Sequence, residues 1–318
     1  MISFEDMPSV GASPERLADW MEVRTLISPN RRFSRSELIG ALGISGSADC
    51  QDDFDDAEEQ TSRDEIVEGV SDSVFAELDD RQKATGGDSG CYPFDLSGNL
   101  LEARGDASKS AYLFLVLLTN WSKENSTQFK QGVKVFEQLS AEAARNYLGG
   151  SSTLGTRSVV FGFPRTEIAK GFSEALNQLC QDVGEGGGVM RTRPKLTHQK
   201  DAKLDVVAWT SFLDGRCGKL IAFGQCAAGI NWNAKTGELG NPADWWKIWI
   251  QEPPAVPPIK MFFVPHRVSR QDWFLTSALA GILFDRCRIA HLACDVPNAL
   301  RAAHSDWTSK VLRQLQTQ

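Results

Sequence analysis

The chain of 318 residues is 42% hydrophobic and 24% charged, which is ordinary for a soluble globular protein long enough for two domains. Its formal net charge of −7 argues against a protein that coats nucleic acid nonspecifically, because such proteins are usually basic. No run approaches the roughly 18–20 apolar residues of a membrane-spanning helix, and the seven cysteines include no CxxC pair. We therefore expect a cytoplasmic protein with free thiols and no membrane partner.

The first half of the chain predicts a mostly helical domain over residues 1–150. One helix is expected from Ser13 to Leu26, after the cap pattern Ser13-Pro14-Glu15, and a second from Ser34 to Leu42. Apolar runs predict two core helices, at 111–118 and 132–148, and the small polar stretch 150–156 predicts a linker.

An acidic insert near 49–80 interrupts this domain. Ten of the residues from 49 to 68 are Asp or Glu. We interpret the stretch as a solvated or disordered loop. The alternative is an acidic mimic of a phosphate backbone that covers a basic groove.

The second half, 151–318, predicts an α/β domain with a mixed central sheet flanked by helices. Apolar residues in steps of three and four predict a helix from Glu167 to Val183. Further along the chain we expect strands at 204–210, 219–226 and 261–264, an aromatic-rich segment at 244–250, a last helix at 273–284 and a strand-like segment at 287–293.

Two neighbouring strands each carry one polar residue where an apolar residue would pack better. Asp205 stands before the apolar run 206–209, and Gln225 follows the run 220–223. The Asp-Gly pair at 214–215 predicts a hairpin between them. A carboxylate and an amide oxygen on adjacent strands can converge on one Mg²⁺ ion, which prefers oxygen ligands.

This arrangement resembles the PD-(D/E)XK restriction-endonuclease-like superfamily over roughly residues 160–270. The resemblance rests on Phe172-Ser173-Glu174, Leu204-Asp205-Val206 and Gly224-Gln225-Cys226, and it is nearest to Mrr-like members that carry Gln-Cys-Lys on the second strand. It implies a restriction-endonuclease-like sheet with Mg²⁺ or Mn²⁺ as cofactor. Asp205 and Gln225 would be metal ligands together with the carbonyl of Cys226, and Glu174 would be the helix acid that organises the metal or its water.

The chain departs from the family pattern at the lysine that should follow Cys226, where Ala227 stands. Lys235, after the second strand, is the first candidate for a replacement cation, and Lys203, two residues before Asp205, is the second. Lys219 is six residues from Gln225, roughly 20 Å along an extended strand, which is too far.

Other patterns give weaker hypotheses. Cys226 with His266 suggests a thiol nucleophile and its base, although a cysteine that ends an apolar strand is more often a small buried hydrophobe. Basic residues at 191–200 suggest phosphate contacts or solvated loop charge. The glycine-rich loop 184–188 follows a helix and is therefore not a phosphate-binding loop. Five tryptophans between 209 and 249 suggest core packing, a partner interface or base stacking.

The resemblance implies Mg²⁺-dependent hydrolysis of DNA phosphodiester bonds, with Asp205, Gln225, Glu174 and Lys235 as catalytic residues. It also implies an endonuclease of a bacterial antiphage or restriction system, working with a partner protein such as a helicase or another ATPase. The alternative is a nuclease fold without activity that binds DNA or assembles a complex, and the missing lysine favours this alternative.

Overall fold

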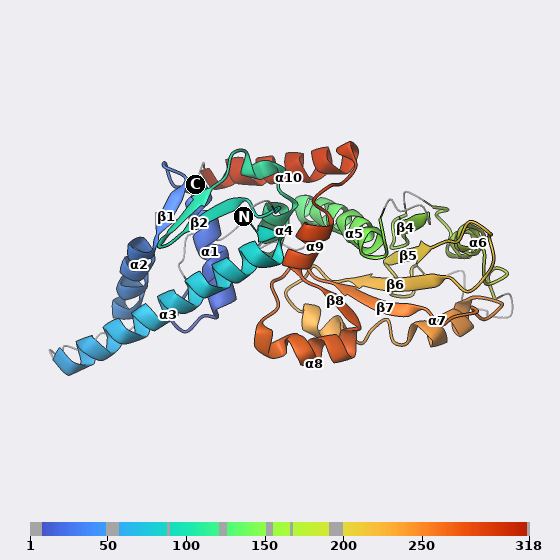
Figure 1. The fold of residues 1–318 in the computed structure, drawn as a ribbon, viewed down its shortest axis with the longest axis horizontal. Coiled ribbons are helices and arrows are strands. Elements are labelled where there is room, and N and C mark those ends of the chain that lie inside the picture. Colours follow the sequence, from blue (N-terminus) through green and yellow to red (C-terminus); the bar gives the residue numbers. More distant parts are fainter. Residues whose placement is uncertain are drawn as a thin grey trace. The chain divides into compact units, whose positions relative to one another are not determined.

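A computed structural model describes residues 8–48, 57–87, 90–120, 126–150, 155–165, 168–190 and 200–316. The chain forms two compact units (Figure 1). Unit 1 comprises residues 1–126 and 301–318, and unit 2 comprises residues 127–300.

Unit 1 is mostly helical, as the sequence predicts, and also contains a small antiparallel sheet. Its helices are α1 (Pro14–Ile27), α2 (Arg35–Ala48), α3 (Ala57–Ala84), the short 3₁₀ helix η2 (Ala107–Lys109), α4 (Ala111–Thr119) and the part of α10 (Asn298–Gln316) from residue 301 onward. The sheet has the order β1-β3-β2, formed by β1 (Arg32–Ser34), β2 (Phe94–Ser97) and β3 (Leu100–Ala103).

The acidic stretch does not remain a loop where the structure describes it. Residues 57–68 form the first turns of α3, and residues 49–56 lie outside the described residues. The helix is held by its later turns, where Val74 and Leu78 are fully buried. The prediction of a solvated loop is therefore wrong for 57–68, because packing at one end stabilises a helix along the whole segment.

A buried ion cluster stabilises unit 1. The fully buried guanidinium of Arg81 contacts carboxylate oxygens of Asp19 at 2.8 Å, Glu22 at 3.0 Å and Glu77 at 2.7 Å. The hydroxyl of Tyr92 donates a hydrogen bond to Glu22 at 2.6 Å. The positive charge of Arg81 thus offsets the negative charges of several carboxylates, whose burial would otherwise be costly.

Unit 2 contains a mixed sheet of five strands with the order β4-β5-β6-β7-β8. The first three strands are antiparallel, and β6, β7 and β8 are parallel. The elements in chain order are α5 (Thr127–Tyr147), β4 (Thr156–Val160), α6 (Phe172–Val183), β5 (Val206–Thr210), β6 (Leu220–Cys226), the 3₁₀ helix η4 (Trp232–Lys235), α7 (Pro242–Trp249), β7 (Ile259–Phe263), α8 (Arg270–Ala280), β8 (Ile282–Phe284) and α9 (Arg286–Leu292).

Helices cover both faces of this sheet (Figure 1). On one face, α6 and α7 pack on the sheet around Phe223 and Trp246, whose rings stack at 5.7 Å. On the other face lie α5 and α9, where Tyr147 of α5 contacts Phe284 of β8 with ring centroids 5.2 Å apart. The predicted α/β architecture, a mixed sheet flanked by helices, is therefore confirmed.

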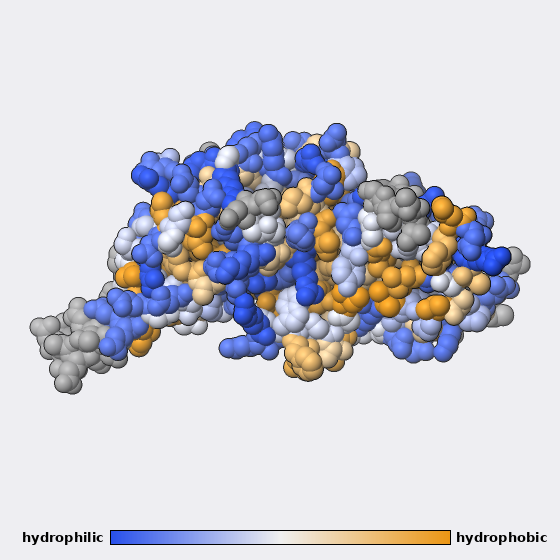
Figure 2. Space-filling model, viewed as in Figure 1, coloured by the Kyte–Doolittle hydropathy of each residue, from blue (hydrophilic) through white to orange (hydrophobic). Residues whose placement is uncertain are grey.

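Helix α8 exposes apolar side chains to solvent. Phe274, Leu275 and Leu279 are each more than half exposed, and Figure 2 shows the apolar surface over this helix. Large apolar side chains gathered on one surface often mark an interaction site.

Several predicted elements agree with the structure. The two strands of the predicted hairpin are β5 and β6, and they pair with Val206 opposite Gly224. The predicted helix 273–284 is wrong beyond Ala280, because Gly281 adopts φ +83 and ends the helix before β8. The strand-like segment 287–293 is also wrong, since it forms α9, which Asp285 caps through the N–H of Arg288.

The structure divides the chain differently from the predicted boundary near residue 150. Helix α5 covers β4, β5 and β6 and belongs to unit 2, while α10 returns to unit 1. Strand β4 begins at the last residue of the predicted linker, 150–156, and pairs antiparallel with β5. The sequence predicts no element over 157–160, because a strand of five residues at the edge of a sheet gives only a weak local pattern.

Gly224 offers a test of how closely the sheet is packed beneath α5. A Cβ atom at Gly224 would lie 2.7 Å from the ring of Phe263 and 3.2 Å from Cβ of Val206. We predict that Gly224→Ala lowers the free energy of unfolding by about 1–3 kcal/mol, the usual cost of overpacking. Gly237→Ala is the matched control, because a Cβ there meets no atom within 4 Å. Urea denaturation of both variants checks the prediction, and equal stabilities would contradict it.

Candidate functional site

Asp205 lies immediately before β5, at the end of the sheet where β4 and β6 finish. Its backbone N–H donates to Gly224 at 2.9 Å, and its carbonyl accepts from Phe161 at 2.7 Å. The carboxylate oxygen Oδ2 accepts a hydrogen bond from the N–H of Cys226 at 2.8 Å. The strands on both sides therefore fix the direction of the carboxylate.

A second carboxyl group, which sequence reasoning missed, lies within reach of the charge of Asp205 and comes from α5. Burial and then the charge of Asp205 raise the pKa of Glu137 to about 8. The pKa of Asp205 rises to about 7, chiefly through burial and to a smaller extent through the charge of Asp201. The site thus gathers carboxyl groups whose charges are poorly compensated, which is a common property of functional sites.

The sequence contained a signal for Glu137. The residue lies among Phe136, Leu139 and Ser140, all fully buried on α5. An acidic residue beside the buried stripe of an amphipathic helix is unusual, because burial of a carboxylate is costly without compensation. Because the predicted domain boundary places this helix outside the α/β domain, the sequence does not predict that Glu137 lies near Asp205.

Gln225 is buried, and both polar atoms of its amide form hydrogen bonds within the protein. Its amide oxygen accepts the N–H of Leu239 at 3.2 Å, and its amide nitrogen donates to Glu238 at 3.2 Å. Residues two apart on a strand share a face, so Gln225 and Phe223 face the layer of α6 and α7. Both polar atoms of the amide are engaged in holding the segment around Glu238.

Glu174 occupies the first turn of α6 and is exposed to solvent. Its carboxylate folds back over Gly171, the residue at the N-cap of the helix. The charge of Asp205 raises the pKa of Glu137 of α5. The role predicted for Glu174 stays a prediction, and Glu137 is a second acid near Asp205 that the sequence analysis did not name.

Ala227, at the position of the family lysine, is buried against Phe262 and Leu283. Two other lysines supply positive charge to Asp205, and Lys235 of η4 lowers the pKa of Asp205 more than Lys203 does. Lys203 also forms an ion pair with Glu238 at 2.9 Å. Among the described residues, the ammonium group of Lys235 has no ion-pair or hydrogen-bond partner.

Cys226, the last residue of β6, is a free thiol, and so are Cys180, Cys217 and Cys287. Cys91 and Cys294 are disulfide-bonded, so the expectation of free thiols is wrong for these two residues. Burial and then the charge of Asp205 raise the pKa of the Cys226 thiol, while a hydrogen bond with Ser140 opposes the shift. A raised pKa disfavours the thiolate that a nucleophile requires. His266 stacks against Trp232 with ring centroids 6.2 Å apart.

The other weaker hypotheses have different outcomes. Residues 191–199 of the basic run lie outside the described residues. The glycine loop 184–188 packs closely, since a Cβ at Gly186 would meet Ile250 at 2.6 Å and Trp246 at 2.9 Å. Trp209, Trp245 and Trp246 are buried in the core, which confirms core packing for these three tryptophans.

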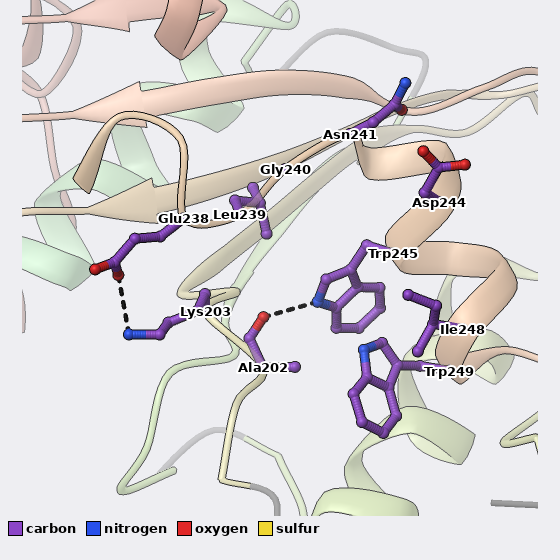
Figure 3. A pocket seen from close by; sticks show the side chains of 10 residues that line it. All are labelled: Ala202, Lys203, Glu238, Leu239, Gly240, Asn241, Asp244, Trp245, Ile248 and Trp249. Atoms are coloured by element: carbon purple, nitrogen blue, oxygen red, sulfur yellow. Dashed lines mark hydrogen bonds and ion pairs between the residues drawn. The ribbon is translucent and has the colours of Figure 1, made fainter. Parts of the chain in front are cut away.

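A pocket of about 440 Å³ lies beside Lys203 and Glu238 (Figure 3). Its apolar wall is formed by Trp245, Ile248 and Trp249 of α7. The indole N–H of Trp245 donates to the carbonyl of Ala202 at 2.9 Å, which fixes the ring against the opposite wall. This pocket is next to the carboxyl site, because Lys203 lines it and also acts on Asp205.

The turn that brings Lys203 to the pocket is strained. Ala202 and Lys203 have φ values of +53 and +67, in the left-handed region that non-glycine residues avoid. The N–H of Leu204 donates to the carbonyl of Asp201 at 3.1 Å, and the carboxylate of Asp201 accepts the N–H of Lys203 at 3.0 Å. Such strain costs of order 1–3 kcal/mol per residue and often occurs at functional sites.

Asp205 and Glu137 offer carboxylate oxygens of the kind that bind divalent cations, whereas both polar atoms of the Gln225 amide already form hydrogen bonds within the protein. Mg²⁺ is commonly bound through one or two carboxylates together with waters and substrate phosphates, and Asp205 and Glu137 are two carboxyl groups near enough for the charge of Asp205 to raise the pKa of Glu137. A cation would also offset the unfavourable charge of two groups whose pKa values are raised. Within the described part of the chain, no three His, Cys, Asp or Glu side chains are grouped so that they could hold a metal ion.

No family model, curated protein or solved structure matches this chain. Among the described residues, no helix has the length and apolar character needed to span a membrane. The resemblance to restriction-endonuclease-like proteins therefore stays a prediction from the sequence.

The two carboxyl groups predict how stability depends on pH. An unperturbed Asp or Glu in the unfolded chain loses its proton near pKa 3.8 or 4.5, but the folded protein keeps these protons until about pH 7–8. The folded state then binds more protons than the unfolded state, so the free energy of unfolding falls as the pH rises through this window.

At pH 8 we expect Asp205→Asn and Glu137→Gln each to have a free energy of unfolding about 1–3 kcal/mol higher than that of the unmodified protein. Both variants should therefore unfold at a higher urea concentration. The gain should become small at pH 4, where the unfolded chain also holds much of these protons. Urea titrations followed by tryptophan fluorescence measure this, with Glu174→Gln as the exposed control. A gain that is the same at both pH values would contradict the raised pKa values assigned to the two groups.

Proposed function

We propose that this chain is a divalent-metal-dependent nuclease that hydrolyses DNA phosphodiester bonds at Asp205 and Glu137. The observation that supports the proposal is a carboxylate fixed at the end of the sheet, Asp205, whose charge raises the pKa of a second carboxyl group, Glu137, while burial raises the pKa of both groups. The resemblance of the β5–β6 hairpin to PD-(D/E)XK nucleases adds support. Glu137 replaces both Gln225 and Glu174 as the partner of Asp205 in this account.

Each residue of the site has a distinct role in the proposed reaction. Asp205 and Glu137 would hold the Mg²⁺ or Mn²⁺ ion, with the backbone carbonyl of Cys226 as a further oxygen at the same strand end. When bound, the ion would activate water and offset the charge of the phosphate. Lys235 carries a cation without an ion-pair partner among the described residues, and it would stabilise negative charge that develops in the transition state.

An inactive nuclease fold that binds DNA or assembles a complex is the second candidate. It is favoured by a specific observation: Gln225 is committed to Leu239 and Glu238, and the family lysine position holds the buried Ala227. In that case Asp205 and Glu137 would be remnants of a lost site.

The biological setting is proposed from the resemblance alone. A bacterial antiphage or restriction system is the usual setting of such nucleases, with a helicase or another ATPase as partner. The exposed apolar side chains of α8 are compatible with a protein partner.

Cleavage assays test the proposal directly. Purified protein is incubated with supercoiled plasmid, labelled single-stranded DNA and labelled RNA, with Mg²⁺, with Mn²⁺ and with EDTA. We expect metal-dependent cleavage of DNA that falls by about 10²–10³-fold or more in Asp205→Ala and Glu137→Gln, the usual effect of losing one preorganised charge. Lys235→Ala should reduce cleavage comparably, and Lys235→Arg should restore part of it.

Two controls separate this site from the alternatives. Glu174→Gln and Cys226→Ser should cleave at nearly the unmodified rate, because neither side chain carries a catalytic role here. Cleavage that survives Asp205→Ala would refute the site. Absence of cleavage with every metal and substrate, with or without an ATPase partner, would favour the inactive scaffold.

A further inference from the structure

The pocket beside the carboxyl site has the character of a site for a flat ring. Its volume of about 440 Å³ lies within the roughly 300–1,000 Å³ that is usual for small-ligand sites. Trp249 is only partly buried, whereas Trp245 is 5% exposed, so the ring of Trp249 supplies the accessible aromatic surface. Trp249 itself is held by an edge-on contact with Phe172 at 5.2 Å.

The charges around the pocket are balanced. Glu238 is paired with Lys203 at 2.9 Å, and Asp244 with Lys247 at 3.6 Å. The pocket therefore favours a neutral ring over a charged ligand. The carboxylate oxygens of Glu238 and Asp244 remain hydrogen-bond acceptors, which suit the exocyclic amino group of a nucleobase.

Two independent observations connect the pocket to the carboxyl site. The strained turn at Ala202 and Lys203 is fixed by Trp245, through the hydrogen bond from the indole N–H to the carbonyl of Ala202. On the other side, Gln225 binds the backbone of Leu239 and the carboxylate of Glu238, both of which line the pocket. The polar residue that the sequence assigned to the metal thus positions a wall of the pocket.

We infer that this pocket holds one unpaired nucleobase of the nucleic-acid substrate, stacked on Trp249, while the backbone of the same strand passes Lys203 and Asp205. The inference rests on the proposed function and extends it to the substrate. A base can enter such a pocket only when it is unstacked and unpaired. The substrate is therefore a single strand, an end or a locally opened duplex, and the base bears an amino group, as adenine and cytosine do.

The test compares oligonucleotides that share a charged backbone and differ in their bases. Fluorescence anisotropy measures binding of labelled 15-residue strands of dA, dC and dT, and of a fully abasic strand of the same length, in EDTA at fixed salt. The unmodified protein should bind dA and dC strands about tenfold or more tightly than the abasic strand, as expected for one stacked base. The dT strand should bind more weakly than dA or dC, because thymine has no amino group.

Trp249→Leu should bring the ratio of natural to abasic affinity close to one without changing affinity for the abasic strand. Ile248→Ala, which alters the same wall, is the second variant and decides the question if Trp249→Leu does not fold. Leu213→Ala is the matched control, because Leu213 is 89% exposed and is not among the residues that line the pocket. It should leave the ratio unchanged.

The inference is overturned if the unmodified protein binds abasic and natural strands equally, binds neither strand, or keeps its preference in the pocket variants. These outcomes are separable from failure of the proposed function, since binding is measured without a metal. A base preference without cleavage would contradict the proposed nuclease activity but support base binding in the pocket. Cleavage without a base preference would contradict base binding in the pocket but support the nuclease activity.

Discussion

The hydrogen bond from the N–H of Cys226 to the carboxylate of Asp205 is the interaction on which the site depends. At 2.8 Å it joins the start of β5 to the end of β6 and fixes the carboxylate at the end of the sheet. Helix α5 then brings Glu137 within reach of the charge of Asp205, in an environment where burial already disfavours the charged form of both groups. Two carboxylates with little compensating charge lower the stability of the folded protein. A bound cation would offset their negative charge, so such a pair is suited to binding a cation.

The pocket and the carboxyl site are built on shared residues. Lys203 lines the pocket, pairs with Glu238 and lowers the pKa of Asp205. Gln225 lies on the strand next to Asp205 and holds Glu238 and Leu239 in place. The strained backbone at Ala202 and Lys203 connects these two regions. The proposed substrate contacts follow from this shared construction: a phosphate beside the carboxylates and a base beside Trp249.

Features with a local signature could be predicted from the sequence. The cap at Ser13, the stripe of α6 and the strands on both sides of the Asp-Gly turn follow from periodicity and turn chemistry. Asp205 is conspicuous because it directly precedes the apolar run of a strand. Glu137 could not be paired with Asp205, because that pairing depends on how α5 crosses the sheet, and β4, which lies between them in the chain, was not predicted as a strand. The hydrogen bonds of Gln225 could not be predicted, because its partners, Glu238 and Leu239, lie in a turn whose path no local pattern specifies.

Calorimetric titration of Mn²⁺ tests the central claim most directly, because the claim is that Asp205 and Glu137 together form a cation site that is protonated when empty. Titrations at pH 6.5 and pH 8 in buffers of different ionisation enthalpy report both the affinity and the protons released. We predict one binding event that strengthens with pH, releases protons at pH 6.5 and is lost in both Asp205→Asn and Glu137→Gln. Binding that is independent of pH, or that persists in both variants, would contradict the account.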